Sequence, residues 1–348
     1  MTSNRAARDV ALDTLMLPFQ DGSVTWPADP PGVLFLRARA GASLPRDAAH
    51  WSCEQSFRPW ADGLLQAGLA LVPMVASGAF ARVLLLPPRQ RQESRALLAR
   101  ASRLLAPDGM LVVAQHNDEG ARSLQDDMHG LFGTVNALSK NHCRAVWASA
   151  GTVDAALADA WLADDSPRPM GADGLLRRPG VFAWDRLDVG SALLIDALPT
   201  DLSGHVADLG AGVGALSVEL LHRCPGIRAL DLFEAEGRAL DLARANIEAL
   251  SPDIPVDYHW RDVAAGIQGR FDAIVMNPPF HTGRAADPGL GQAFIAAAAS
   301  SLVSGGRLLL VANRHLPYEA TLGAAFTHVH RLREADGFKV VEARRSAR

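Results

Sequence analysis

The chain has 348 residues, is 49% hydrophobic and 21% charged, and carries a formal net charge of −4. These values fit a folded protein large enough for two domains, and they exclude intrinsic disorder and wholesale coating of nucleic acid, which shows as a basic excess. The apolar runs are no longer than a strand and no signal peptide is recognisable, so we expect a cytoplasmic protein with no membrane partner. The three cysteines have no paired spacing, so we expect buried thiols rather than disulfides.

An internal repeat gives the first indication of the architecture. Residues 83–114 and residues 274–312 both read as a buried strand, a Pro-Pro pair, a helix, a tight turn and a second buried strand. Such continuous apolar strands are typical of parallel sheets that helices cover on both faces. Any two βαβ units resemble each other to some degree, but the shared Pro-Pro pair favours two related α/β domains.

The boundary between these domains falls in a stretch rich in Pro, Gly and Asp. Residues 164–174 have this composition and no hydrophobic periodicity, which is typical of a surface connection. We therefore predict a first domain at residues 1–165, a linker at 166–179 and a second domain at 180–348.

The second domain alternates between helices and strands, and Asp336-Gly337 near its end predicts a hairpin turn. In chain order, the pattern predicts helices at 190–197, 216–221, 239–249 and 292–303, and strands at 206–209, 229–233, 256–258, 271–276, 307–312, 327–333 and 338–342. We expect a doubly wound, seven-stranded sheet of the Rossmann-like α/β class with an antiparallel edge hairpin.

A glycine-rich loop joins the strand at 206–209 to the next helix. Glycines are needed where a ligand lies directly on the backbone at a sharp turn. Gly210, Gly212 and Gly214 fit the loop of methyltransferases, whereas Gly210, Gly212 and Ala215 fit that of dinucleotide-binding proteins. Glu234, at the end of the next strand, is placed to bind ribose hydroxyls in either class, so the loop leaves the cofactor class open.

Two further carboxylates belong to this candidate cofactor site. Asp208 either binds an amino group of the cofactor or fixes the glycine loop. Asp262 follows the third strand, where it is placed to accept a hydrogen bond from an adenine amino group, unless it is an exposed loop carboxylate. His328 and His330 share a strand face, but two histidines without a third ligand do not predict a metal site, so we expect no metal.

The run Asn277-Pro278-Pro279-Phe280 ends an apolar strand, at the edge of the sheet where ligands of open α/β folds bind. An exocyclic amino nitrogen is a poor nucleophile because its lone pair is delocalised into the ring. The Asn277 side-chain carbonyl and the Pro278 backbone carbonyl can accept its two hydrogens, which orients it for in-line attack on a sulfonium. The prolines fix the backbone and Phe280 offers a stacking face, so this run favours methylation of a planar amino nitrogen over a simple turn.

Several segments of the chain resemble the ribosomal RNA guanine-N2 methyltransferases of the small-subunit methyltransferase C and large-subunit methyltransferase G type. The resemblance covers the C-terminal half and rests on residues 180–191, 208–214, 277–281, 311–318 and 337–340. Residues 139–144 of the first half also look similar to that family. Glu234 departs from the pattern, in which a shorter Asp is often found.

The resemblance implies two tandem methyltransferase domains, of which the N-terminal one is degenerate and supports RNA binding. This half has no glycine loop, and Leu86 stands where Asn277 stands in the second copy. By position, residues 277–280 would hold the target guanine, the glycine loop and Glu234 would hold S-adenosylmethionine, and Phe182 and Asp188 would help close the site.

The sequence therefore predicts an enzyme that methylates guanine N2 in ribosomal RNA or a ribosomal subunit, with 16S rRNA favoured over 23S rRNA. Two alternatives keep the fold and change the acceptor, to adenine N6 in DNA or to a glutamine amide in a release factor. A third is a non-catalytic RNA-binding assembly protein, which the intact run at 277–280 disfavours.

Overall fold

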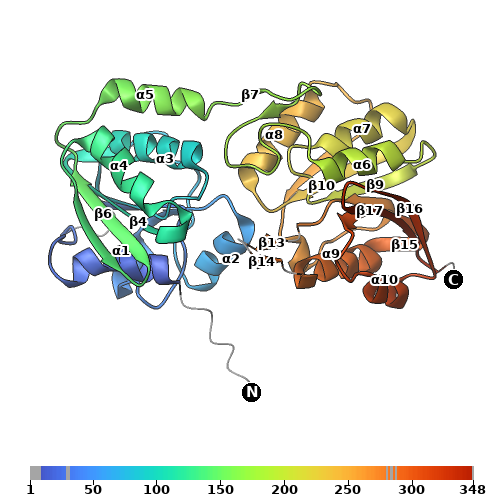
Figure 1. Cartoon of the computed structure of the whole chain (residues 1–348), viewed down its shortest axis with the longest axis horizontal. Helices are drawn as coiled ribbons and strands as arrows, with labels where there is room; N and C mark the ends of the chain where they lie inside the picture. Colours follow the sequence, from blue (N-terminus) through green and yellow to red (C-terminus); the bar gives the residue numbers. More distant parts are fainter. Residues whose placement is uncertain (1–8, 29–31, 280, 283–284, 287, 347–348) are drawn as a thin grey trace, which may run out of the picture. The chain divides into compact units, whose positions relative to one another are not determined.

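The computed structural model of the chain describes residues 9–28, 32–279, 281–282, 285–286 and 288–346. The chain divides into two compact units, Met1–Ser166 and Pro167–Arg348, which run from blue to green and from green to red in Figure 1. In the described residues, no helix combines the length and apolar character that crossing a bilayer requires. Cys53, Cys143 and Cys224 are free and buried, as predicted.

The first unit is built on a six-stranded sheet with strand order β2-β1-β3-β4-β6-β5. Its elements are α1 (Val10–Gln20), β1 (Val33–Leu36), η2 (Arg46–His50), β2 (Ser52–Glu54), α2 (Arg58–Gln66), β3 (Phe80–Leu85), α3 (Arg91–Leu104), β4 (Leu105–His116), η3 (Asn117–Glu119), α4 (Ala121–Phe132), β5 (Asn136–Lys140), β6 (Cys143–Ser149) and α5 (Ala155–Asp164). One face of the sheet packs against α1 and α2 and the other against α3, α4 and α5.

The second unit is built on a seven-stranded sheet with strand order β11-β10-β9-β12-β15-β17-β16. Its elements are β7 (Arg168–Pro169), β8 (Leu176–Arg177), α6 (Val189–Ala197), β9 (Ser203–Leu209), α7 (Ala215–Arg223), β10 (Gly226–Glu234), α8 (Gly237–Glu248), β11 (Val256–Trp260), η4 (Val263–Ala265), β12 (Phe271–Met276), β13 (His281–Thr282), β14 (Ala285–Ala286), α9 (Pro288–Ser301), β15 (Leu302–Asn313), α10 (Glu319–Ala325), β16 (His328–Ala335) and β17 (Phe338–Arg344).

This sheet is doubly wound because its apolar strands are buried on both faces. Helices α6, α7 and α8 cover one face, and α9 and α10 cover the other (Figure 1). Strands β9, β10, β11, β12 and β15 are paired in parallel, whereas β17 pairs antiparallel with both β15 and β16. Asp336 and Gly337 have φ of +52° and +80° in the two-residue turn of the β16–β17 hairpin, which suits such turns. The predicted fold class is confirmed.

The internal repeat is visible in the strand register. In the first sheet Phe80 pairs with Leu105 and Arg82 with Met110, so residues 106–109 loop out of β4. In the second sheet Phe271 pairs with Leu302 and Ala273 with Arg307, so residues 303–306 loop out of β15. The predicted tight turns are therefore bulges within long strands, at the same place in both sheets.

Residues 167–179, most of the predicted linker, are packed into the second unit. Strands β7 and β8 form a short antiparallel hairpin in which Arg168 pairs with Arg177. The side chain of Arg177 is fully buried. The Pro-rich and Gly-rich composition correctly indicated turns but did not reveal the hydrogen bonds that hold this hairpin in place.

Candidate cofactor and acceptor site

A cleft lies beside the carboxyl ends of β9 and β12, where ligands of open α/β sheets bind. It holds about 400 Å³ of empty space, a figure that includes open solvent at its mouth. Of the residues predicted from the sequence, Phe182, Asp188, Gly210, Gly212 and Asn277 line this cleft. The other lining residues are Arg177, Ala183, Leu187, Ser191, Ala211, Val213, Ala215 and Leu216.

The glycine-rich loop forms one wall of the cleft. Gly210 and Gly212 have φ of +75° and +57°, a left-handed backbone conformation that residues with a side chain rarely adopt. The backbone N–H groups of Gly210 and Ala211 donate to the Phe233 carbonyl at 2.8 and 3.1 Å, which fixes the loop against β10. A Cβ atom added at Gly212 would meet no heavy atom within 4 Å, so a ligand can approach this part of the backbone closely.

Gly214 and Asp262 do not belong to the cleft lining. Gly214 precedes α7, and a Cβ atom at this position would lie 3.2 Å from the Cβ of Ala243 in α8. Glycine there permits the close approach of the loop to α8. Asp262 accepts a hydrogen bond from the Ala264 N–H at 2.9 Å and caps η4, which gives its carboxylate a local structural partner.

Asp208 is fully buried behind the glycine loop. Its Oδ2 accepts a hydrogen bond from Ser217 Oγ at 2.7 Å, whereas its Oδ1 has no hydrogen-bond partner among the described residues. Burial raises the pKa of Asp208 to about 7, although the hydrogen bond from Ser217 lowers it and the negative charge of Glu234 raises it further. An orphaned acceptor of this kind is costly unless a ligand or water binds it.

The Glu234 carboxylate is bound to the backbone on both sides. Its Oε2 accepts from the Gly212 N–H at 2.8 Å, and its Oε1 accepts from the Glu236 N–H at 2.8 Å. Burial raises the pKa of Glu234, while these backbone hydrogen bonds lower it. Glu234 does not line the cleft itself, but it ties the glycine loop to the end of β10.

Asn277 is held by two residues of the segment that forms the facing wall. Its Nδ2 donates to Asp188 Oδ2 at 3.0 Å and to Ser191 Oγ at 2.9 Å. A carboxylate can only accept, so Asp188 determines which way the amide is turned. The nitrogen of the amide therefore faces α6, and its carbonyl oxygen is left as the acceptor for a ligand.

Asp188 also caps α6, because its Oδ2 accepts from the Ser191 N–H at 3.0 Å. Glycine at position 190 permits close packing here, since a Cβ atom would lie 3.0 Å from Asp188 Oδ2 and 3.1 Å from the Phe338 ring. The family-like segments around Asp188 and Phe338 thus meet beside Asn277.

The rest of the Asn-Pro-Pro-Phe run is only partly described. Pro278 is buried and Pro279 is exposed, and neither lines the cleft. Phe280, predicted as a stacking residue, lies outside the described residues. Phe182, at the cleft, is 61% exposed, and such a large exposed apolar side chain is suited to contact a ligand.

Sequence reasoning missed Ser191 and Arg177, which both line the cleft. Ser191 binds Asn277 from 86 residues away in the chain. Ser191 lies within the family-like segment at 180–191, which was the one available signal. Nothing in the sequence indicated that Arg177 would be buried.

The cleft lining combines the backbone of the glycine loop, the carboxylate of Asp188 and the oriented amide of Asn277. The carboxylate suits a cationic group of a cofactor, and the amide carbonyl suits an acceptor that presents N–H groups. Among the described residues, no cluster of three or more His, Cys, Asp or Glu side chains is arranged to hold a metal ion.

Comparisons with known proteins agree with this site. The family profile described as "Methyltransferase small domain" matches residues 174–342. The ribosomal RNA small subunit methyltransferase C of Shewanella loihica is 32% identical over 77% of this chain and 78% of its own length. The protein of the same name from Psychromonas ingrahamii is 30% identical over 75% of both chains.

A solved structure extends the similarity to nearly the whole chain. The 16S rRNA N2 methyltransferase of T. thermophilus, in complex with AdoMet and guanosine, matches 98% of this chain and 93% of its own. The TM-score is 0.80 and the sequence identity is 25%. This chain therefore belongs to the family of ribosomal RNA small subunit methyltransferase C, and its second unit carries the methyltransferase small domain.

Proposed function

We propose that this chain transfers the methyl group of S-adenosylmethionine to the exocyclic N2 of a guanine in 16S rRNA. The observation that carries the proposal is the orientation of Asn277, whose amide nitrogen is bound to Asp188 and Ser191 so that its carbonyl oxygen is left for the acceptor. Family membership supports 16S rRNA over 23S rRNA, because the relatives carry the small-subunit name.

The residues of the cleft fit S-adenosylmethionine. This cofactor is cationic at its sulfonium and its amino group. Asp188 lines the cleft, and Asp208, which precedes the glycine loop, is buried with its Oδ1 lacking a partner in the described part of the chain. The open space above Gly212 leaves its backbone accessible to the ligand. We expect Glu234 to receive the ribose hydroxyls with the oxygen lone pairs that its two backbone hydrogen bonds leave free.

The residues of this chain orient the acceptor rather than activate it by proton removal. S-adenosylmethionine, when bound, supplies a methyl group already activated by the positive charge on sulfur. The Asn277 carbonyl accepts one N–H of the amino group and the Pro278 backbone carbonyl accepts the other, so that the nitrogen lone pair points at the cofactor side of the cleft. Positioning of this kind can supply much of an enzyme's rate advantage, and the product nitrogen loses its proton to solvent.

We assign the first unit a supporting role in RNA binding. After β1, where the second unit has its glycine loop, the first unit has Arg37 and Arg39. Arg37 Nη1 donates to Ser56 Oγ at 2.6 Å, and Arg39 Nη1 lies 3.0 Å from Asp9 Oδ2. The first unit therefore has two arginines with polar partners where the second unit has glycines, and it lacks the glycine backbone on which a nucleoside cofactor would lie.

A transfer assay with labelled cofactor tests the proposal. The protein is incubated with labelled S-adenosylmethionine and one substrate at a time: unmodified 16S rRNA, small subunits, 23S rRNA or large subunits. The nucleosides of each substrate are then analysed. We expect label as N2-methylguanosine in 16S rRNA, either free or in small subunits. Label confined to 23S rRNA, to adenine or to protein, or absent from every substrate, would contradict the proposal.

A further inference from the structure

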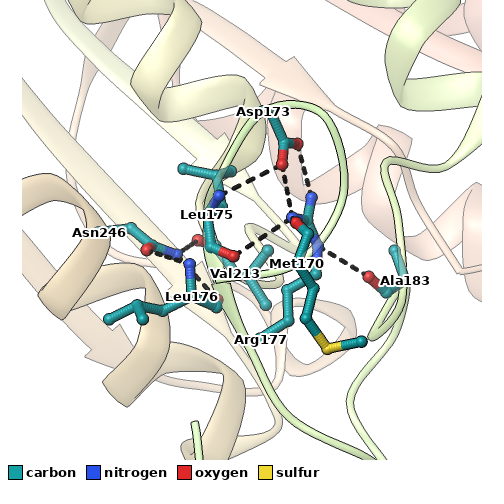
Figure 2. A network of polar contacts seen from close by, with 8 residues as sticks. All are labelled: Met170, Asp173, Leu175, Leu176, Arg177, Ala183, Val213 and Asn246. Atoms are coloured by element: carbon teal, nitrogen blue, oxygen red, sulfur yellow. Dashed lines mark hydrogen bonds and ion pairs between the residues drawn. The ribbon is translucent and has the colours of Figure 1, made fainter. Parts of the chain in front are cut away.

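A buried arginine in the lining of the cleft makes contacts with two separate parts of the chain. Arg177 is fully buried, and its Nη1 and Nη2 each lie 2.6 Å from an oxygen of Asp173. Its Nη1 also donates to the Met170 carbonyl, and its Nε donates to the Ala183 carbonyl at 3.0 Å. Figure 2 shows the guanidinium between the turn that carries Asp173 and the segment that carries Ala183.

The same hairpin is bound to the glycine loop through α8. Asn246 accepts from the Leu176 N–H at 2.7 Å and donates to the Leu176 carbonyl at 3.1 Å. Its Nδ2 also donates to the Val213 carbonyl at 2.9 Å, in the glycine loop (Figure 2). Hydrogen bonds therefore join Val213 to Leu176 through Asn246, and the next residue along the chain, Arg177, is hydrogen-bonded to Ala183.

The two residues at the ends of these contacts, Val213 and Ala183, line the cleft. Val213 belongs to the wall formed by the glycine loop, and Ala183 belongs to the facing wall with Phe182 and Asp188. Ala183 has φ of +54°, a left-handed conformation that alanine rarely adopts without support from its surroundings. The Arg177 Nε–H donates to the Ala183 carbonyl and so supports this conformation.

We propose that Arg177 is a positioning residue that sets the separation between the two walls of the cofactor cleft. Arginine is required because Asp173 binds the two terminal nitrogens end-on, which leaves Nε directed at Ala183. Lysine would keep the charge but has no second, fixed donor direction. The inference rests on the proposed function insofar as the cleft holds S-adenosylmethionine.

The test compares Arg177→Lys with Arg307→Lys in the full chain. Arg307 is a matched control because it also bridges carboxylates of this unit, Asp201 at 2.7 Å and Glu342 at 2.9 Å, and it does not line the cleft. We expect Arg177→Lys to raise both the Kd and the KM for S-adenosylmethionine about tenfold with a much smaller change in kcat, and to speed amide hydrogen exchange at residues 181–188. Arg307→Lys should leave these quantities unchanged.

Asp173→Asn is the second variant, because Asp173 is partly exposed and its replacement is milder than that of a buried arginine. It should shift the Kd and the exchange in the same direction as Arg177→Lys. Unchanged exchange at 181–188 in both variants, or equal effects of Arg177→Lys and Arg307→Lys, would overturn the inference. A wild-type protein that binds no S-adenosylmethionine would instead overturn the proposed function, and the exchange would still decide the role of Arg177.

Discussion

At the scale of single residues, Asn277 illustrates how a side chain can be given one orientation. An amide can turn over by half a rotation and exchange its oxygen and nitrogen with little change in shape. Asp188 prevents this because turning the amide would place two oxygens against each other at about the present 3.0 Å separation. The Asn277 carbonyl oxygen, which accepts a hydrogen bond from the substrate, is thus fixed in place before the substrate binds.

Asn277→Ala should leave cofactor binding largely intact and remove transfer. We expect kcat to fall by about 100-fold or more, because the acceptor amino group loses its alignment, while the Kd for S-adenosylmethionine stays within about threefold. Single-turnover assays and calorimetry would measure the two effects. Equal losses of binding and transfer would show that Asn277 instead supports the cofactor.

Ser191→Ala is the graded comparison. It removes one of the two acceptors of the Asn277 amide and leaves the bond to Asp188. A net hydrogen bond is worth about 1 kcal/mol, so kcat should fall by roughly fivefold.

The raised pKa of Asp208 predicts a pH dependence of cofactor affinity. With a pKa of about 7, this carboxyl is largely protonated at pH 6 and largely ionised at pH 8. A bound cation favours the ionised form, so binding releases a proton below neutral pH. The Kd for S-adenosylmethionine should rise as the pH falls from 7.5 to 6, by at most about tenfold per unit for one proton.

Calorimetry at several pH values would check this, with Asp208→Asn as the control that should show a flat profile in the same window. A wild-type profile as flat as that of the variant would contradict the prediction. In the absence of cofactor, burial raises the folded-state pKa of Asp208 above the unfolded value of 3.8. The contribution of Asp208 to stability is therefore full below pH 3.8 and is lost as the pH rises through about 7.

At the scale of elements, the side chain of Tyr318 limits the space available at Gly291 in α9. A Cβ atom there would lie 1.8 Å from Tyr318 Oη, and Tyr318 is fully buried. Gly291→Ala should therefore lower the free energy of unfolding by about 1–3 kcal/mol through overpacking, although alanine is the better helix former.

Gly323→Ala is the matched control within the same unit. Gly323 lies in α10, and an added Cβ atom would meet nothing within 4 Å. This change should stabilise the protein by up to about 1 kcal/mol. Urea unfolding of both variants would measure the difference, and stabilisation by both would refute the role assigned to the Tyr318 contact.

Most elements of the second unit could be predicted because their signals are local. Strand β12 (Phe271–Met276) coincides with its predicted bounds, and the Asp336-Gly337 turn joins β16 and β17. The hairpin of β7 and β8 was missed because its stability comes from contacts with Asn246, 70 residues away. Arg177 was missed because hydropathy assigns arginine to the surface, and its burial depends on Asp173 and on carbonyls that only the folded hairpin brings together.

The residues of the candidate site also fall into two groups, those with a local sequence signal and those whose contacts only the fold creates. The glycine loop and Asn277 could be found because their spacing along the chain reflects a local backbone requirement. The contact of Asn277 with Ser191 could not, since no sequence pattern pairs residues that lie in different elements. Phe280 and its predicted stacking role stay a prediction.

At the scale of the whole molecule, the two units share the same order of strands in their sheets, but the second sheet has one more strand at its edge. In both sheets, a run of parallel strands is followed by two strands that pair antiparallel. The first sheet has six strands and the second has seven. The strand without a counterpart is β11, next to β10 at the edge of the second sheet.

This difference predicts one cofactor molecule per chain. The second unit has a backbone cradle, whereas in the first unit Arg37 and Arg39 follow β1 and Leu86 replaces the asparagine. Calorimetric titration with S-adenosylmethionine should give a stoichiometry of about one. Two equivalent sites per chain would contradict the prediction that the first unit is degenerate.

The bulges in β4 and β15 match in ways that bear on the origin of the two units. Both loop out four residues opposite one, both follow a Phe–Leu pair, and both end in a glycine, Gly109 or Gly306, whose added Cβ atom would lie 2.8 to 3.0 Å from a backbone carbonyl oxygen. Two folds that arose independently would have no reason to share such an irregularity at one register position. The shared bulge is what we expect if both units descend from one duplicated domain, in which case the four-residue loop is older than the duplication.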